Sequence, residues 1–573
     1  MAPPVVSASS SAAVVARFLK ARGVDRVFAL CGGHIMPLWM RCDAEGIRII
    51  DVRDERAAVH MAHAHAELTG GLGVALVTAG PGVTNAMTGI ANAHVSRAPV
   101  LVLSGVVPRQ QENRGALQDM VHTDLLRSIT RYARTVREPS LVVQELDEAV
   151  SRAFGEGGEP GPVYLDFPTD TLRAEVGPRQ QAEEHLRPKR AATLFPDPAA
   201  VRAAADLLWS AKRPLVISGR GARAAGPELV RLLDAAGAVY LDTGESRGLV
   251  PDEHPSVIAA MRGSVMGEAD LVVTVGRRLD FQLAYGSASV FCNAQWLRIA
   301  DAASELRDNR RGTVELFASP SAALAALVEA GRGRQPAVDR AWARALRQKH
   351  EERAAKLRET MRNAPDGKDG RMHPNKLLAA LQEVLPKDAI VVADGGDFLS
   401  FARVALPATT YLDPGPFGCI GVGVPFGIAA SLAFPARTVV VATGDGSFGF
   451  NAIELDTAVR HGAKPLFVVA NNGAWQIEVH DQTETYGKVV GTKLQTSDYA
   501  ALARAFGMHG ERVERAADLP AALERAMARR PALLDVLVAT DAVSADGKSG
   551  LAWVPDLMPL AAWDEAERKW RDG

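Results

Sequence analysis

Short runs of β-branched and apolar residues alternate along the chain with longer stretches of helical period that are rich in Ala, Leu and Arg. The alternation occurs in three successive blocks, which is typical of parallel α/β sheets. The pattern therefore predicts an α/β fold made of three doubly wound parallel-sheet domains. The predicted strands are Val27–Leu30, Gly73–Thr78, Val100–Ser104, Pro162–Asp166, Pro214–Ser218, Ala238–Asp242, Leu271–Val275, Trp296–Ile299, Ala389–Ala393, Thr438–Ala442, Leu466–Ala470 and Leu533–Val538.

Interruptions of this pattern give the domain boundaries. The polar stretch Gly177–Pro198 indicates a linker, and the charged helical stretch Ala337–Arg362 with the loop Asn363–His373 closes the middle block. Beyond Asp541 the alternation stops in an irregular segment with Gly, Ser, Trp and Pro. We expect domains at residues 1–180, 195–360 and 372–540, followed by a C-terminal lid or tail at 541–573.

Composition narrows the class of protein. A chain of 573 residues is too long for one core, and 47% hydrophobic with 23% charged residues is ordinary for a globular protein. The net charge of −2 gives no electrostatic reason for binding nucleic acid or an anionic membrane. No apolar run approaches the ~20 residues that span a bilayer, and the start lacks a secretory signal. The four scattered cysteines suit reduced thiols, so we expect a cytoplasmic protein without disulfides or zinc.

The strongest chemical signal lies after two neighbouring strands of the last block. Asp445 follows the strand Thr438–Ala442, and Asn472 follows the next one. Parallel strands bind ligands at their carboxyl ends, so the two side chains are expected side by side. With the Ala474 carbonyl they offer the hard oxygen ligands that Mg²⁺ prefers, and leave places for diphosphate oxygens. The alternative is an ordinary Gly-rich turn.

These residues resemble thiamine-diphosphate enzymes of the acetolactate-synthase type, and the resemblance covers nearly the whole chain. It implies a pyrimidine-binding domain, a nucleotide-fold middle domain and a diphosphate-binding domain, in that order. It also implies thiamine diphosphate and Mg²⁺ as cofactors, a homodimer with its active site at the subunit interface, and assembly to a homotetramer. The residues that it assigns to the cofactor are Gly33, Pro81, Asn85, Gly396, Asp397, Ile420, Gly444, Gly446, Ser447 and Trp475.

Glu55 matches the activating glutamate of the family, because Arg53–Ala58 resembles its motif and Thr78–Asn85 resembles the loop under the pyrimidine. A carboxylate there would hydrogen-bond the aminopyrimidine and favour the imino tautomer that removes the thiazolium proton. The alternative is a solvated charge at a helix start. Ile420, in the Gly-rich run 418–425, matches the apolar wedge that bends the cofactor, although a buried Ile is more often a core residue.

Three segments resemble the 2-hydroxyacyl-CoA lyase subgroup: Cys31–Ile35, Asn113–Gln118 and Asp280–Gly286. The resemblance implies cleavage of a short 2-hydroxyacyl-CoA, such as 2-hydroxyisobutyryl-CoA, to formyl-CoA and a ketone or aldehyde. Gln118 and His34 would then hydrogen-bond the substrate, unless Gln118 only caps a turn and His34 is an ordinary loop histidine. Rival functions are an acetolactate-synthase-type carboligase, an oxalyl-CoA-type decarboxylase and a non-catalytic nucleotide-binding paralogue.

Other residues predict a second nucleotide contact. Gly219-Arg220-Gly221 follows a middle-block strand, and in CoA-processing relatives this domain resembles an ADP site. The candidates for ADP or CoA contacts are Arg220, Arg278, Asp301, Arg403 and Lys548. Two positions depart from the family pattern, because Asp397 adds an unexplained negative charge and Lys493 adds a cation. His60, His63 and His65 have metal-like spacing but no Cys or Asp partner in pattern, which disfavours a metal there.

Overall fold

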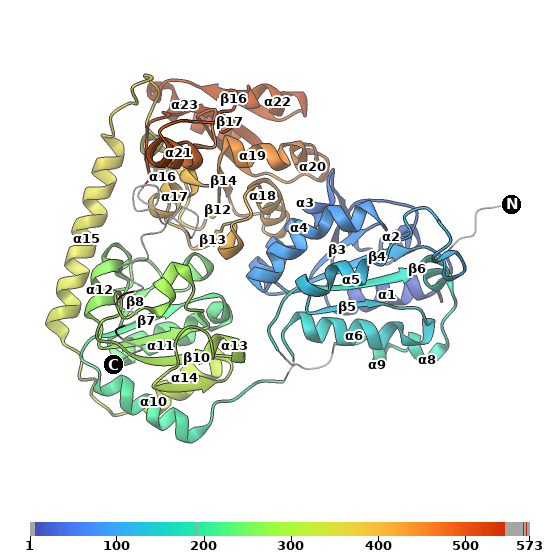
Figure 1. Ribbon diagram of the computed structural model, residues 1–573, viewed down its shortest axis with the longest axis horizontal. Helices are drawn as coiled ribbons and strands as arrows, with labels where there is room; N and C mark the ends of the chain where they lie inside the picture. The colour runs from blue at the N-terminus through green and yellow to red at the C-terminus, as the bar shows by residue number, and fades with distance from the viewer. Residues whose placement is uncertain (1–5, 157, 189–191, 545–564, 566–568, 570–573) are drawn as a thin grey trace.

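The structure, a computed structural model, describes residues 6–156, 158–188, 192–544, 565 and 569. It contains three parallel sheets in separate domains, with the first domain on the right of Figure 1 and the other two on the left. The predicted α/β fold of three parallel-sheet domains is confirmed. In the described part of the chain, no helix is both long and apolar enough to cross a membrane.

The first sheet has the strand order β2-β1-β3-β4-β6-β5, and every neighbouring pair is parallel. Its strands are β1 (Arg26–Ala29), β2 (Arg48–Asp51), β3 (Gly73–Val77), β4 (Val100–Val106), β5 (Tyr132–Thr135) and β6 (Val163–Pro168). Its helices are α1 (Ser11–Ala21), α2 (Met36–Ala44), α3 (Glu55–Thr69), α4 (Pro81–Ser96), α5 (His122–Leu126), α6 (Val142–Ala153) and α7 (Thr169–Arg173). The predicted linker contains two single-turn helices, α8 (Pro178–Gln181) and α9 (Glu183–Leu186).

The middle sheet has the order β11-β10-β9-β7-β8. Its strands are β7 (Pro214–Ser218), β8 (Val239–Leu241), β9 (Leu271–Val275), β10 (Gln295–Ala300) and β11 (Val314–Phe317). Its helices are α10 (Pro198–Ser210), α11 (Gly226–Ala236), α12 (Arg262–Glu268), α13 (Ala303–Leu306) and α14 (Pro320–Ala330). The long helix α15 (Arg340–Arg362) then runs along the outside of the molecule to the last domain (Figure 1).

The last sheet has the order β13-β12-β14-β15-β17-β16, which repeats the order of the first sheet strand for strand. Its strands are β12 (Ile390–Asp394), β13 (Thr410–Leu412), β14 (Val439–Gly444), β15 (Leu466–Asn471), β16 (His509–Val513) and β17 (Ala532–Leu537). Its helices are α16 (Pro374–Val384), α17 (Asp397–Ala405), α18 (Gly423–Ala433), α19 (Asp445–Asn451), α20 (Leu455–His461), α21 (Gln476–Tyr486), α22 (Tyr499–Ala505) and α23 (Leu519–Ala528).

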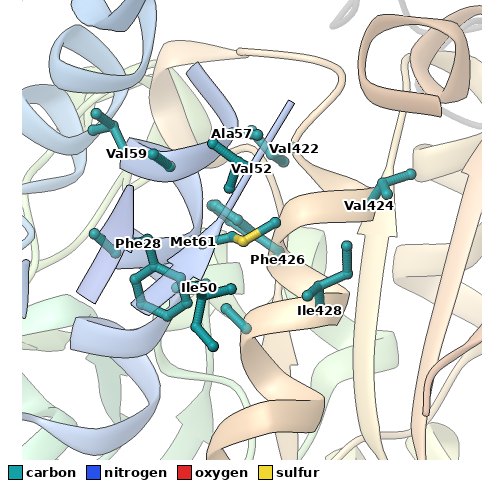
Figure 2. Packing of buried hydrophobic residues seen from close by; sticks show 14 of the residues in the cluster. Phe28, Ile50, Val52, Ala57, Val59, Met61, Val422, Val424, Phe426 and Ile428 are labelled. Carbon is teal, nitrogen blue, oxygen red and sulfur yellow. The ribbon is translucent and has the colours of Figure 1, made fainter. Parts of the chain in front are cut away.

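The first and last domains share a hydrophobic core where α3 packs against α18. Figure 2 shows Met61 of α3 beside Phe426 of α18 within one buried cluster. The His63 ring meets Phe426 edge-on, with ring centroids 5.1 Å apart. Helix α3 begins at Glu55, and α18 begins three residues after Ile420. The packing of these two helices therefore fixes the orientation of two predicted site segments.

The histidines of α3 belong to this packed region. His63 contacts Glu67 at 3.0 Å and Asn92 at 3.5 Å, and burial lowers the pKa of His60 to about 3. Within the described residues, no group of three or more His, Cys, Asp or Glu side chains is arranged to hold a metal ion. His60 and His63, whose rings both meet Phe426, are thus part of the interdomain core, and His65 packs on Phe28 of the first domain.

Candidate active site

The predicted site segments lie where the strand order of each sheet reverses. In the first sheet these are the turns after β1 and β3, which carry His34 and Pro81; in the last sheet they are the turns after β12 and β14. Crevices at the carboxyl ends of strands at such switch points are the usual ligand sites of open α/β sheets. Topology alone therefore gathers the candidate residues of each domain at one sheet edge.

Glu55 is held at the first residue of α3 by the turn that starts this helix. The Asp54 carboxylate caps the helix by accepting from the Arg56 N–H, and the Glu55 side chain is only 7% exposed. Asn85 Nδ2 donates to Glu55 Oε2 at 3.1 Å. A Cβ placed on Gly82 would lie 3.4 Å from Glu55 Oε1, so the second oxygen faces the Thr78–Asn85 segment. The structure thus brings Glu55 and Asn85 together.

His34 and Gln118 form a second pair in the first domain. The two side chains are neighbours, and burial lowers the pKa of His34, with the Gln118 side chain opposing the shift. Gln118 has a left-handed φ of 64° and packs on Gly80, where a Cβ would lie 2.9 Å from Gln118 Cβ. Gly33, beside His34, has open space where a side chain would be. The pair is therefore placed at the same sheet edge as Glu55.

In the last domain, Asp445 and the Asn472–Ala474 turn are in contact. Asp445 opens α19 after β14, is 2% exposed, and accepts from the Gly473 N–H at 3.0 Å. Asn472 follows β15, and its Oδ1 accepts from the Ala474 N–H at 3.2 Å. Strands β14 and β15 pair directly, which puts both turns at one edge. The structure thus brings the three predicted metal ligands together.

The charge at this edge fits a bound cation. Burial raises the pKa of Asp445 to about 6, although backbone N–H groups of Gly473 and the adjoining turns oppose the shift. Among the described side chains, no Lys, Arg or His forms an ion pair with this carboxylate. A buried charge without a partner is unfavourable, and Mg²⁺ takes carboxylate, amide and carbonyl oxygens. The donor set formed by Asp445, Asn472 and Ala474 therefore fits Mg²⁺ and, through it, a diphosphate.

The glycines in the turns after β12 and β14 make room for neighbouring side chains of the protein as well as for the predicted cofactor. A Cβ on Gly446 would lie 2.6 Å from the ring of Trp475, so glycine is required there because the indole covers it. A Cβ on Gly396 would lie 3.1 Å from Ile477, whereas Gly444 meets only an ordinary contact at 3.8 Å. The sequence assigns these glycines to the cofactor, and at Gly446 the close neighbour within the chain is Trp475, which has the same assignment. Ser447 Oγ lies against Gly395, in the turn after β12.

Asp394 is a residue that the sequence interpretation missed. It ends β12, is fully buried, and its carboxylate accepts from the N–H groups of Gly395, Gly421 and Gly423 at 2.7 to 3.2 Å. Asn451 Nδ2 donates to the Gly421 carbonyl at 2.6 Å. These bonds fix the turn that carries the half-buried Ile420. An aspartate that ends an otherwise apolar buried strand was the available signal, because buried carboxylates need donors.

The structure accounts for the negative charge of Asp397. The Ser544 N–H donates to Asp397 Oδ1 at 3.2 Å, and His480 Nε2 lies 4.0 Å from the other oxygen. His480 Nε2 also lies 3.1 Å from the Ala542 carbonyl. Asp397 and His480 therefore hold the first residues of the predicted 541–573 segment. The remaining part of that segment, including Lys548, lies outside the described residues apart from residues 565 and 569.

The basic residues predicted to contact ADP pair with carboxylates. Arg220 donates to Glu67 of α3, and Arg278 donates to Glu159 of the first domain. Asp301 follows β10 at the same edge of the middle sheet. The positive charge expected for phosphate groups is thus neutralised by the chain itself.

The glycines beside Arg220 are also occupied by protein. A Cβ on Gly219 would lie 2.6 Å from the Gly276 carbonyl oxygen, and one on Gly221 would lie 2.8 Å from Gly276 Cα. Arg403 lies elsewhere, on α17, with its guanidinium 3.4 Å from Asp413. These contacts within the chain argue against the predicted ADP site, because the Gly-Arg-Gly turn packs on a neighbouring turn and its arginine joins two domains; ADP binding itself stays a prediction.

We accordingly expect ADP to leave the melting temperature of the protein unchanged. A ligand that binds only the folded state raises the melting temperature by mass action, and ADP would have to break two ion pairs to bind. Thermal unfolding with ADP, next to thiamine diphosphate with Mg²⁺ as the positive control, checks this. A concentration-dependent rise with ADP would contradict it.

Lys493, the second departure from the family pattern, is exposed and pairs through its backbone with Ala474 in an isolated antiparallel bridge. The Trp475 N–H donates to the neighbouring Thr492 carbonyl at 2.9 Å. The loop around Lys493 therefore supports the turn that carries the predicted carbonyl ligand.

Comparison with known families gives a match to a segment of each of the three sheet domains. Residues 10–126 match the profile described as thiamine pyrophosphate enzyme, N-terminal TPP binding domain. Residues 201–327 match the central domain and residues 394–536 the C-terminal TPP binding domain of the same family. The chain belongs to the thiamine pyrophosphate enzyme family, whose cofactor is also called thiamine diphosphate.

Relatives fall into two groups. The acetolactate synthase large subunit IlvG of Mycobacterium tuberculosis is 35% identical over 536 residues, which cover 91% of this chain and 95% of that protein. The 2-hydroxyacyl-CoA lyase 2 of Homo sapiens is 32% identical over 541 residues, 87% of this chain and 84% of the relative. The 2-hydroxyacyl-CoA lyase 1 of Mus musculus is 30% identical over 556 residues, 92% and 94% respectively. This chain is thus a thiamine-diphosphate enzyme similar to both groups.

Proposed function

We propose that the protein is a lyase that cleaves, or in reverse forms, the carbon–carbon bond of a short 2-hydroxyacyl-CoA such as 2-hydroxyisobutyryl-CoA. The products are formyl-CoA and a ketone or aldehyde. The observation that carries the proposal is that His34 and Gln118 lie together at the same sheet edge as Glu55. The similarity to 2-hydroxyacyl-CoA lyases supports it. The 35% identity to an acetolactate synthase makes a carboligase of that type the second candidate.

In this proposal each group of residues has one task. Asp445, Asn472 and the Ala474 carbonyl hold Mg²⁺ and with it the diphosphate. Glu55 hydrogen-bonds the aminopyrimidine and holds the proton that is exchanged there. Thiamine diphosphate, when bound, supplies the electron sink for the carbon that loses its bond.

His34 and Gln118 act on the substrate. The bond between the acyl carbon and the hydroxyl-bearing carbon breaks, the hydroxyl oxygen becomes the ketone oxygen, and the acyl carbon gains a proton. Because the pKa of His34 is lowered by burial, its imidazole is mainly neutral at pH 7 and can accept the hydroxyl proton. Gln118, the neighbour of this imidazole, then hydrogen-bonds the substrate beside it.

We also propose a homodimer as the minimal active unit. Within one chain the candidates form two groups, each held by contacts within its own domain. Large apolar side chains are exposed beside both groups, which is typical of interaction surfaces. These are Leu117, Met120, Val121 and Leu125 near Gln118, and Phe450 and Ile453 near Asp445. A second copy that covers both patches would join the first domain of one subunit to the last domain of the other. Further assembly to a homotetramer stays a prediction.

The substrate class has a direct test. With thiamine diphosphate and Mg²⁺, we expect the enzyme to release formyl-CoA and acetone from 2-hydroxyisobutyryl-CoA, as measured by chromatography of the CoA products. Pyruvate, with acetolactate as the assayed product, is the matched alternative substrate. Acetolactate formation without turnover of CoA thioesters would favour the carboligase, and no turnover of either by cofactor-loaded protein would favour a non-catalytic paralogue.

A further inference from the structure

A buried hydrogen-bonded group lies directly beneath the Thr78–Asn85 segment. His122 opens α5 and is 1% exposed, and the Gly80 N–H donates to its Nε2 at 2.8 Å. An N–H donor requires an unprotonated acceptor, so the imidazole is neutral and carries its proton on Nδ1. Nδ1 lies 3.4 Å from Asp166 Oδ2. The tautomer of His122 is therefore set by a backbone amide on one side and a carboxylate on the other.

The carboxylate is itself fixed. Asp166 lies on β6, is 1% exposed, and accepts from the Tyr164 hydroxyl at 3.0 Å. Burial, and secondly Asp166, raise the pKa of Tyr164 well above its usual range, so the phenol keeps its proton and stays a donor. Tyr164 and Asp166 both lie on β6, a strand whose residues are all buried and which pairs with β4 and β5, so together they form a rigid support for His122.

Gly80 is the point at which this support meets the candidate active site. It has φ 61° and ψ −112° and precedes α4, which begins at Pro81. Gln118 packs on Gly80 closely enough to exclude any Cβ, and Gly82, two residues on, faces Glu55 Oε1. A shift of Gly80 would therefore move the Gln118–His34 pair and the surface against which Glu55 lies.

We infer that His122, oriented by Asp166, is a positioning residue that fixes Gly80 and thereby sets the placement of Gln118 and His34 relative to Glu55. The inference rests on the proposed function for the roles of these three residues. His122 touches neither cofactor nor substrate in it. A histidine that only filled the core would need no particular tautomer, whereas here both ring nitrogens have a defined partner.

The experiment compares His122→Gln with His122→Phe. Glutamine can accept from the Gly80 N–H through its carbonyl and donate to Asp166 through its amide; phenylalanine keeps the ring shape and offers neither bond. We expect His122→Phe to bind thiamine diphosphate and Mg²⁺ normally, but to lose about 100-fold in kcat with little change in KM, as for a misplacement of about 1 Å. We expect His122→Gln to recover most of this loss. His65→Phe, a histidine replacement elsewhere in the same domain, controls for altered stability.

A second readout separates this inference from the proposed function. The near-ultraviolet circular dichroism of the imino tautomer of the bound cofactor requires no substrate, and we expect it to weaken in His122→Phe and return in His122→Gln. Equal signals and equal kcat in wild type and His122→Phe would overturn the inference, as would equal losses in the Gln and Phe variants. If the wild type shows this signal but no lyase activity, only the proposed function fails.

If His122→Phe does not fold, His122→Asn, whose shorter side chain does not reach Gly80, takes its place with the same expectations.

Discussion

Asp445→Ala is expected to abolish Mg²⁺-dependent binding of thiamine diphosphate, with affinity at least about 100-fold weaker than in the wild type. Changes of groups that merely support a metal ligand already cost 10- to about 100-fold in metal affinity. Asp445 supplies the only carboxylate of the predicted set, so without it only two neutral oxygens are left to hold Mg²⁺. Without Mg²⁺ the negative charge of the diphosphate is uncompensated. Isothermal calorimetry of cofactor binding with and without Mg²⁺ measures the effect.

The matched control is Asp498→Ala, because Asp498 also stands at the start of a helix of the last domain, where it caps α22. Loss of this cap is expected to cost about 1 kcal/mol of stability and to leave cofactor affinity intact. Unchanged affinity in Asp445→Ala, or the same Mg²⁺-dependent loss in both variants, would contradict the assignment of the metal site.

The sequence pattern identified the strands that lie inside the sheets and missed most strands at their edges. The missed strands are β2, β5, β11, β13 and β16, and each is the outermost strand of its sheet. Strand β5 has no fully buried residue, and β2 and β16 have one each. An edge strand half exposed to solvent needs no continuous apolar run, so it gives little signal. The edge strand β8 was predicted, and all three of its residues are buried.

The residues of the candidate site also fall into those that the sequence could predict and those that it could not. Asp445 and Asn472 could be proposed because each follows a recognisable strand, and Glu55 because its segment resembles a family motif. Asp394 and His122 could not be assigned a role, because their partners are remote: Gly421 lies 27 residues from Asp394, and Asp166 lies 44 residues from His122. Such contacts depend on how strands are ordered in the sheet, which hydrophobic periodicity does not encode.

The contacts that argue against the ADP prediction could not be read from the sequence for a related physical reason. A glycine–arginine–glycine turn after a strand has the same local pattern whether it meets a phosphate or another turn. Arg220 is neutralised by Glu67, which comes from a different domain and lies 153 residues away in the sequence. Local sequence can show that a positive charge is present, but the three-dimensional packing decides whether a ligand or the chain itself compensates it.

Glu55→Gln is expected to retain the cofactor and to slow exchange of its thiazolium proton by about 10²- to 10⁴-fold, the usual contribution of a positioned acid–base group. The amide keeps the size of the side chain and a hydrogen bond to Asn85, so the Thr78–Asn85 segment stays in place. The amide of the glutamine does not carry the negative charge that favours the imino tautomer. Quenched-flow exchange in deuterated water, followed by NMR of the released cofactor, measures the rate.

Glu145→Gln is a suitable control for Glu55→Gln, because Glu145 is also a first-domain glutamate with 7% exposure, and it accepts from the Tyr132 hydroxyl instead of facing the site. We expect this variant to exchange the proton at the wild-type rate even if it is less stable. If Glu55→Gln binds the cofactor and exchanges at the wild-type rate, Glu55 does not activate it. If Glu55→Gln loses the cofactor altogether, the carboxylate serves binding rather than proton transfer. Slow exchange in the Glu55 variant alone would tie the chemistry of the bound cofactor to the one carboxylate that the first domain presents beside Asn85.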